Sequence, residues 1–359
     1  MDEMAAAGRE TAAAADATGR AAPAGTVSLR KPYLLFLGEE TSPLKAKTAF
    51  GLRDWVPGDC IGQWRMGACR VDLGLPELDP AAAVAAGARS LAIGVTPPEG
   101  RIPAHWARLL GAAAEAGLDI VSGLHTPLAA VPGLAAAALR GGARLVDVRV
   151  PPPGLPRATG KRRSGKRVAM VGTDCALGKK YTALALARAM RAHGVDADFR
   201  ATGQTGIMIA GAGIAVDAVV ADFIAGAAEC ISPAAAPEHW DVIEGQGSLF
   251  HPAYAGVSLG LLHGSQPDAL VLCHDPSRTR MVSWPDYPLP GLRDAAGLYV
   301  RMARMTNPAA RLAGVSLNTS ALDAAQAEAA LQAAGRELGV PAFDPMRGAL
   351  DAAVAAILG

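Results

Sequence analysis

Aromatic residues make up only 4% of the 359-residue chain, so its core must be built from aliphatic side chains and alanine. Cysteine is also scarce. The five cysteines are widely spaced and include no CxxC pair, which argues against a disulfide framework or a zinc knuckle and predicts a reduced, cytoplasmic protein. The sequence contains neither HxxxH nor HExxH, so we do not expect a transition-metal site.

The chain also lacks a charge excess and long apolar runs. A formal net charge of +1 argues against a broad basic surface for nucleic acid. No apolar run reaches the roughly 18 residues that span a bilayer, so we expect neither nucleic acid nor membrane as a partner. Residues 1–28 are rich in alanine without the apolar segment of a secretory signal, and we interpret them as a disordered tail.

Glycine and proline, in contrast, are abundant, with 41 and 26 residues and no collagen period. Short apolar runs alternate with helical patterns, which is typical of a parallel sheet covered by helices on both faces. The predicted strands lie at 33–37, 90–94, 120–121, 145–148, 167–171, 241–243, 269–272 and 312–317. The predicted helices lie at 103–117, 127–140, 179–193, 321–338 and 347–358.

We therefore predict an α/β protein of two domains. A Rossmann-like N-terminal domain, without a GxGxxG fingerprint, occupies residues 29–156, and a P-loop NTPase-type domain with a doubly wound parallel sheet occupies 157–359. The boundary is rich in proline and then in basic residues. Lys166 and Arg167 end this basic stretch and either flank an anionic ligand at the next loop or belong to a solvated linker.

The strongest motif is GTDCALGKKYT at 172–182, between a predicted strand and a predicted helix. Such a loop wraps backbone N–H groups around a phosphate, and its lysine reaches the terminal phosphates. Lys180 stands where a Ser or Thr would bind Mg²⁺, and Thr182 is the alternative hydroxyl. The predicted cofactor-binding positions are Gly172, Thr173, Asp174, Cys175, Ala176, Gly178, Lys179, Lys180, Tyr181 and Thr182.

Several other residues are candidates for the same site. Glu244 follows a predicted strand and either binds Mg²⁺, acts as a base or caps a turn. Gln204 and Thr205 lie in a glycine-rich turn and are candidate ligand contacts. Asp217 and Asp222, five residues apart on an expected helix, face different sides.

Five further residues have two interpretations each. Helix-end amides are expected to lower the pKa of the Cys175 thiol, which either carries an acyl group or packs. His251 is either functional or a structural imidazole. Asn318 either reads an adenine edge or forms an Asx turn. Arg278 and Arg280 either hold substrate carboxylates or are exposed loop charges.

The loop spacing resembles that of dethiobiotin synthetase-like P-loop proteins, and the strand running into VIEGQG at 242–247 resembles their acidic glycine-rich turn. Taken together, the motifs at 121–125, 172–182, 201–213, 217–223, 244–254 and 263–268 resemble the DgcN-type family over about residues 33–358.

This resemblance implies a D-glutamate N-acetyltransferase that uses acetyl-CoA and works with an epimerase partner. The P-loop would then hold the diphosphate of CoA or a nucleotide, and Glu244, Gln246 and His251 would line the reacting end. Glu244 or His251 would be the catalytic base, and the substrate-binding candidates are Gln204, Thr205, Gln246, Arg278 and Arg280.

Two other functions remain open at this point. An ATP- and Mg²⁺-dependent ligase or carboxylase-like enzyme would place the metal on Glu244 and a P-loop hydroxyl. A partition-type ATPase would need a second lysine early in the loop, where the chain has Thr173, Asp174 and Cys175. The sequence leaves the acceptor and a homo-oligomeric state undetermined.

Overall fold

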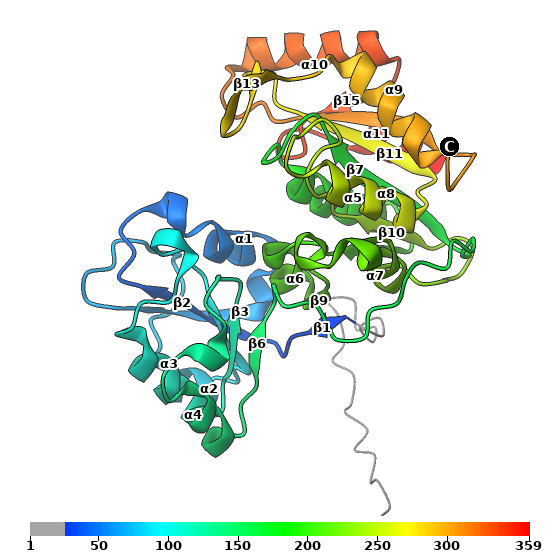
Figure 1. Cartoon of the computed structure of the whole chain (residues 1–359). Helices are drawn as coiled ribbons and strands as arrows, with labels where there is room; N and C mark the ends of the chain where they lie inside the picture. Colours follow the sequence, from blue (N-terminus) through cyan, green and yellow to red (C-terminus); the bar gives the residue numbers. More distant parts are fainter. Residues whose placement is uncertain (1–25) are drawn as a thin grey trace, which may run out of the picture.

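The computed structural model describes residues 26–359. Two parallel sheets form separate layers, each covered by helices (Figure 1). The strand orders are β3-β2-β4-β5-β6 in the N-terminal sheet and β15-β14-β11-β7-β10-β8 in the C-terminal sheet. The predicted α/β class, a Rossmann-like domain followed by a P-loop domain, is confirmed.

The N-terminal sheet is built on β2 (Tyr33–Gly38), whose six residues are all buried because neighbouring strands and helices enclose it. The predicted strands correspond to β2, β4 (Ser90–Ile93), β5 (Asp119–Ser122) and β6 (Leu145–Asp147). The prediction missed β3 (Cys60–Arg65), α1 (Lys47–Trp55) and α2 (Pro80–Ala85).

The two helices expected in this domain are shorter than the sequence pattern suggests. The first is α3 (Trp106–Glu115). The expected helix at 127–140 is instead a 3-10 turn at Leu128–Ala130 followed by α4 (Leu134–Gly141). Gly133, in the left-handed region with φ of 73°, separates these two elements.

In the C-terminal sheet, β7 (Lys166–Gly172) lies centrally between β10 (Trp240–Ile243) and β11 (Ala269–His274). The remaining strands are β8 (Ala197–Arg200), β14 (Arg311–Leu317) and β15 (Ala342–Phe343), and a separate hairpin joins β12 (Arg280–Met281) to β13 (Trp284–Pro288). The strands β7 and β10 are adjacent and parallel, so the loops that follow them open next to one another at the carboxyl edge of the sheet. The chain then crosses past β7 to β11, and ligands of parallel sheets bind where the strand order reverses in this way.

Helices cover both faces of this sheet. The predicted helices at 179–193, 321–338 and 347–358 are confirmed as α5 (Lys179–Ala192), α10 (Ala324–Leu338) and α11 (Asp351–Leu358). The others are α6 (Gln204–Ala210), α7 (Ile224–Ile231), α8 (Ala255–Ser265) and α9 (Leu292–Ala303). None of the helices among residues 26–359 is both long and apolar enough to cross a bilayer.

The region around α6 departs from the prediction. We expected a turn at 201–206, but α6 begins at Gln204, so the second half of this range is helical. Asp217 and Asp222 do not share a helix; each lies in a separate 3-10 turn, Val216–Ala218 and Ala221–Phe223.

The helix α6 ties the two domains together (Figure 1). The Tyr33 hydroxyl donates to the Met208 carbonyl at 2.9 Å, and the Lys31 ammonium donates to the Ile209 carbonyl at 2.9 Å. One apolar core therefore runs from the N-terminal sheet into α6. Residues 1–25 of the predicted tail lie outside the described part of the chain. At the end of the predicted tail, β1 (Val27–Ser28) pairs with β9 (Ala212–Gly213), so these residues form a strand.

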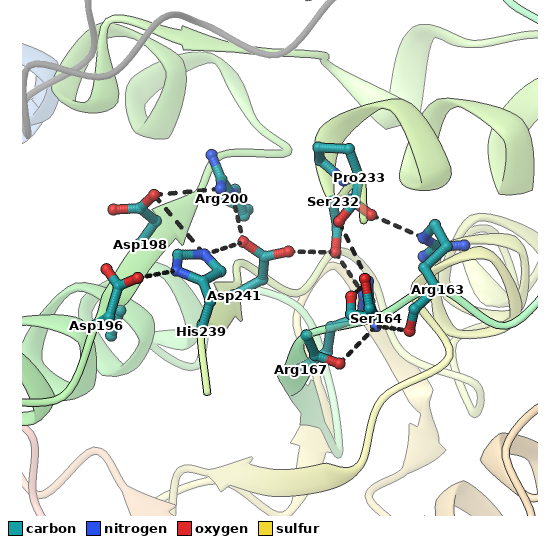
Figure 2. A network of polar contacts seen from close by, with 12 residues as sticks. Arg163, Ser164, Arg167, Asp196, Asp198, Arg200, Ser232, Pro233, His239 and Asp241 are labelled. Carbon is teal, nitrogen blue, oxygen red and sulfur yellow. Dashed lines mark hydrogen bonds and ion pairs between the residues drawn. The ribbon is translucent and has the colours of Figure 1, made fainter. Parts of the chain in front are cut away.

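The expectation that Lys166 and Arg167 flank the phosphate loop is wrong, because they start β7 and the loop follows its other end. The Arg167 guanidinium is buried and donates to the Ser232 hydroxyl at 2.7 Å. Figure 2 shows the network that this pair joins, in which Asp241 accepts from Ser232 at 2.5 Å and His239 lies 3.1 Å from Asp241. This cluster is a structural element of the P-loop domain.

Candidate active site

A cavity of about 740 Å³ opens where the two domains meet. Its walls come from both domains, with the P-loop and the turn after β10 on one side. The lining residues are Lys47, His125, Arg149, Cys175, Ala176, Leu177, Gly178, Lys179, Lys180, Tyr181, Gly203, Gln204, Thr205, Asp217, Glu244, Gly245, Gln246, Gly247, Tyr254 and Val257. Of the predicted positions, Gly172, Thr173, Asp174, Thr182, His251, Arg278, Arg280 and Asn318 do not line it.

The P-loop presents two lysines to this cavity. Gly178 adopts the left-handed region with φ of 102°, which lets the chain turn sharply into α5. The Lys179 ammonium donates to the Asp174 carbonyl at 2.7 Å and is almost fully buried. Burial lowers the pKa of both Lys179 and Lys180, so an anion in the cavity would stabilise their charged forms.

The hydroxyl groups of the loop point away from the cavity. The Thr182 hydroxyl lies 2.8 Å from that of Ser316 beneath the loop, which contradicts its expected role as a metal ligand. The Thr173 hydroxyl lies 2.9 Å from Nδ1 of His274. The Gly172 carbonyl accepts from Tyr299 at 2.8 Å. These residues shape the loop from below.

Tyr181, by contrast, lines the cavity itself. Its ring stacks with that of Trp55 at a centroid distance of 6.1 Å. The Lys180 ammonium lies 4.7 Å from the Tyr181 ring centroid, a cation–π distance. Trp55, which belongs to the N-terminal domain, thereby packs against the helix that carries the P-loop lysines.

Arg278 supports the outer side of the loop. Its guanidinium donates to the carbonyls of Cys175 at 3.1 Å and Ala176 at 2.9 Å and pairs with Asp275 at 3.0 Å. Asp174 accepts from the amides of Cys175 at 2.6 Å and Val282 at 2.9 Å. Arg278 and Asp174 therefore hold loop backbone, and neither is presented to a ligand in the cavity.

Two other predicted contacts lie outside the cavity. Arg280 is exposed on the β12–β13 hairpin, where it donates to the Asp286 carbonyl at 3.4 Å. The Asn318 side-chain oxygen accepts from the Ser320 amide at 3.2 Å, which is the Asx turn, and its amide donates to Asp275 at 3.3 Å.

Cys175 lines the cavity as part of the loop, and His251 lies near it outside the cavity. Burial raises the pKa of the Cys175 thiol, so the expected lowering is wrong. His251 is buried between the rings of Tyr254 and Trp284, and its Nε2 lies 4.0 Å from Asp174. Ligand atoms of Asp174, Cys175 and His251 lie within 4.8 Å of one another. However, Nδ1 of His251 accepts from the Ala253 amide at 3.2 Å, so the lone pair of this nitrogen is not free for a metal.

Glu244 is a buried carboxylate that lines the cavity. Its Oε2 accepts from the amides of Thr202 at 2.9 Å and Gly203 at 3.0 Å. Burial raises the pKa of Glu244, although nearby Lys180 opposes this shift. The Gln246 amide donates to the Thr202 hydroxyl at 3.1 Å and supports the same turn. A held carboxylate with a raised pKa is suited to accept a proton.

The sequence analysis missed two basic residues of the site, Lys47 and Arg149. The Arg149 guanidinium donates to Gln204 at 2.9 Å and to Asp217 at 3.0 Å, across the domain interface. A signal was available, because Arg149 follows the carboxyl end of β6, the edge at which ligands of parallel sheets bind.

Comparisons with known proteins agree with this architecture. Residues 156–354 match a family model described as a domain of unknown function (DUF1611_C) P-loop domain, and residues 62–151 match the DUF1611_N Rossmann-like domain. A crystal structure of a DUF1611 family protein from Anabaena variabilis has a TM-score of 0.80 at 34% identity and covers 92% of this chain and 99% of its own.

Two curated relatives are named D-glutamate N-acetyltransferase. One, from Tritonibacter scottomollicae, is 48% identical over 89% of this chain and 96% of its own length. The other, from Pseudoalteromonas sp, is 43% identical over 92% of this chain and 99% of its own. Sequence and fold agree over nearly the whole chain, and we conclude that it belongs to the DUF1611 family.

Proposed function

We propose that the protein is a D-glutamate N-acetyltransferase that moves an acetyl group from acetyl-CoA to the amine of the amino acid. The carrying observation is one cavity that joins a phosphate loop to a buried carboxylate, Glu244. The names of the two curated relatives supply the substrate class. The resemblance to DgcN-type proteins supports an epimerase as the partner enzyme.

The P-loop side of the cavity suits the donor. Lys179 is almost fully buried, and burial lowers the pKa of both Lys179 and Lys180, so the diphosphate of CoA would stabilise their charged forms. The left-handed Gly178 lets loop amides approach those phosphates closely. We assign the donor's phosphates to this wall.

Glu244 and the adjacent turn suit the transfer step. Glu244 takes a proton from the acceptor ammonium, and the free amine attacks the thioester carbonyl carbon. The C–N bond forms, the C–S bond breaks, and the CoA thiolate leaves with the second proton of the attacking nitrogen, while the first proton passes from Glu244 to water. We assign the oxyanion donors to backbone amides of Gly245–Gly247, which line the cavity beside Glu244. The products are N-acetyl-D-glutamate and CoA.

The geometry gives less support to an ATP- and Mg²⁺-dependent ligase. Such an enzyme needs a loop hydroxyl on the metal, and the Thr182 hydroxyl is buried against Ser316. Lys180 occupies the usual hydroxyl position. One oxygen of Glu244 already accepts two amide hydrogens.

The direct test is to incubate the purified protein with acetyl-CoA and a panel of D- and L-amino acids and to identify products by mass spectrometry. We expect N-acetyl-D-glutamate and free CoA. The proposal would be overturned by the absence of any acetylated product, above all if Mg·ATP were turned over to ADP in a parallel reaction.

A further inference from the structure

The cavity has a second wall with basic residues, and this wall belongs to the N-terminal domain. Lys47 begins α1, His125 follows β5 and Arg149 follows β6, so all three lie at the carboxyl edge of the N-terminal sheet. This wall is separate in sequence from every residue that we assign to the donor.

The cations of this wall have unused binding capacity. The Lys47 side chain is exposed, and its ammonium makes no hydrogen bond or ion pair with any of the described residues. The Arg149 guanidinium has five N–H donors and uses one on Gln204 and one on Asp217. Its side chain is 30% exposed. Both groups are therefore available to an anion within the cavity.

Glu244 is connected to both walls of the cavity. The turn that holds its carboxylate, Thr202–Gly203, leads directly into Gln204, which Arg149 contacts. On the donor side, Glu244 interacts electrostatically with Lys180. An acceptor whose ammonium lies at Glu244 would have its carboxylates in the same cavity as Lys47 and Arg149.

We propose that Lys47 and Arg149 select an acidic acceptor by binding its side-chain carboxylate, so that the N-terminal domain reads the acceptor and the P-loop domain holds the donor. This inference rests on the proposed function. Asp217 partly neutralises Arg149 and competes with the ligand for its guanidinium. A ligand carboxylate can replace Asp217 as the partner of Arg149. The uncharged side-chain amide of glutamine forms a weaker interaction with the guanidinium and compensates less for the broken ion pair.

The test measures binding separately from turnover. Isothermal titration with D-glutamate and D-glutamine, in the presence of CoA, is run on the full-length protein and on Lys47→Met and Arg149→Met. We expect D-glutamate affinity to fall about 10- to 100-fold in each variant, the preference over D-glutamine to shrink, and the Kd of acetyl-CoA to stay within about twofold.

Three more variants separate recognition from folding. Arg149→Lys, which keeps the charge, is expected to recover part of the affinity. Asp217→Asn is expected to tighten D-glutamate binding, a gain that loss of packing would not produce. Arg140→Met, an exposed arginine on α4 paired only with Glu115 among the described residues, is the matched control and should change nothing.

The possible outcomes distinguish the two proposals. Unchanged D-glutamate preference in folded Lys47→Met and Arg149→Met would overturn the inference, as would a failure of the unmodified protein to bind D-glutamate. Binding that depends on these residues, but without acetyl transfer, would overturn the proposed function and retain the recognition site.

Discussion

Glu244 and Thr202 hold each other through two hydrogen bonds. The Thr202 amide donates to the Glu244 carboxylate at 2.9 Å, and the Thr202 hydroxyl donates to the Glu244 carbonyl at 2.8 Å. Backbone and side chain of the same glutamate are therefore fixed by one residue. Such restraint orders the proposed base before the substrates arrive.

Glu244→Gln preserves the shape of the carboxylate but removes its ability to take a proton. We expect kcat to fall about 10²- to 10⁴-fold while the Kd of acetyl-CoA changes little. Because the base works only when ionised, and burial raises its pKa above 4.5, wild-type kcat/KM should rise with pH through that raised value. A full pH–rate profile checks this, and an acid limb that survives in Glu244→Gln would exclude Glu244 as the group responsible.

Gly206→Ala tests whether the position of that carboxylate matters. A Cβ at Gly206 would lie 2.3 Å from Oε2 of Glu244, so the carboxylate would have to move. We expect at least about a tenfold loss of kcat, because a small displacement of a catalytic group is costly. Gly297→Ala, in α9 with no atom near its Cβ, is the matched control and should leave kcat unchanged. Equal rates for both variants would contradict the prediction.

Lys179→Ala tests the phosphate-binding assignment. Loss of the lysine should weaken acetyl-CoA binding by about 100-fold or more, because a charge-assisted contact in a site withdrawn from water is lost. Titration calorimetry measures the affinity, and circular dichroism reports folding. Lys161→Ala, an exposed lysine of the boundary segment, serves as control. A folded Lys179→Ala protein with unchanged affinity would refute the assignment.

The buried cluster of Figure 2 should make stability depend on pH. Hydrogen bonds to Asp241 and Asp196 raise the pKa of His239 above 6.5 against the opposing effect of burial. The charged imidazole is thus favoured in the folded state, and its contribution is complete below pH 6.5 and is lost as pH rises through the raised pKa.

The matching variant is His239→Gln. Its free energy of unfolding should be about 1–3 kcal/mol lower than that of the unmodified protein near pH 6, and the difference should narrow at alkaline pH. Denaturant titrations at several pH values measure this. A difference that stays constant across the range would contradict the linkage to His239.

Much of the fold could be predicted because most of its strands have a recognisable local sequence pattern. Tyr33–Gly38 is an uninterrupted apolar run, as expected for a strand buried on both faces. Cys60–Arg65 mixes apolar with polar residues and includes a glycine, and it was missed. This strand shows neither a continuous apolar run nor a regular alternation of apolar and polar residues.

The candidate site was harder to predict, since its residues depend on distant partners. The loop motif predicts Lys179 and Lys180 as cofactor contacts, and both residues line the cavity. The motif does not reveal that Thr182 points inward, because its partner Ser316 lies 134 residues away. Arg149 was missed for the same reason, as its contacts with Gln204 and Asp217 form only once the two domains are packed.

The shared helix α6 has a consequence for how this protein can be divided. A fragment cut at the proline-rich boundary would uncover Ile207, Met208 and Ile209, which are buried in the core that includes β2. It would also leave β9 without the strand β1 that pairs with it. The two domains are therefore not independent modules. Fusing either one to a different domain would require redesign of the apolar interface between α6 and the N-terminal sheet.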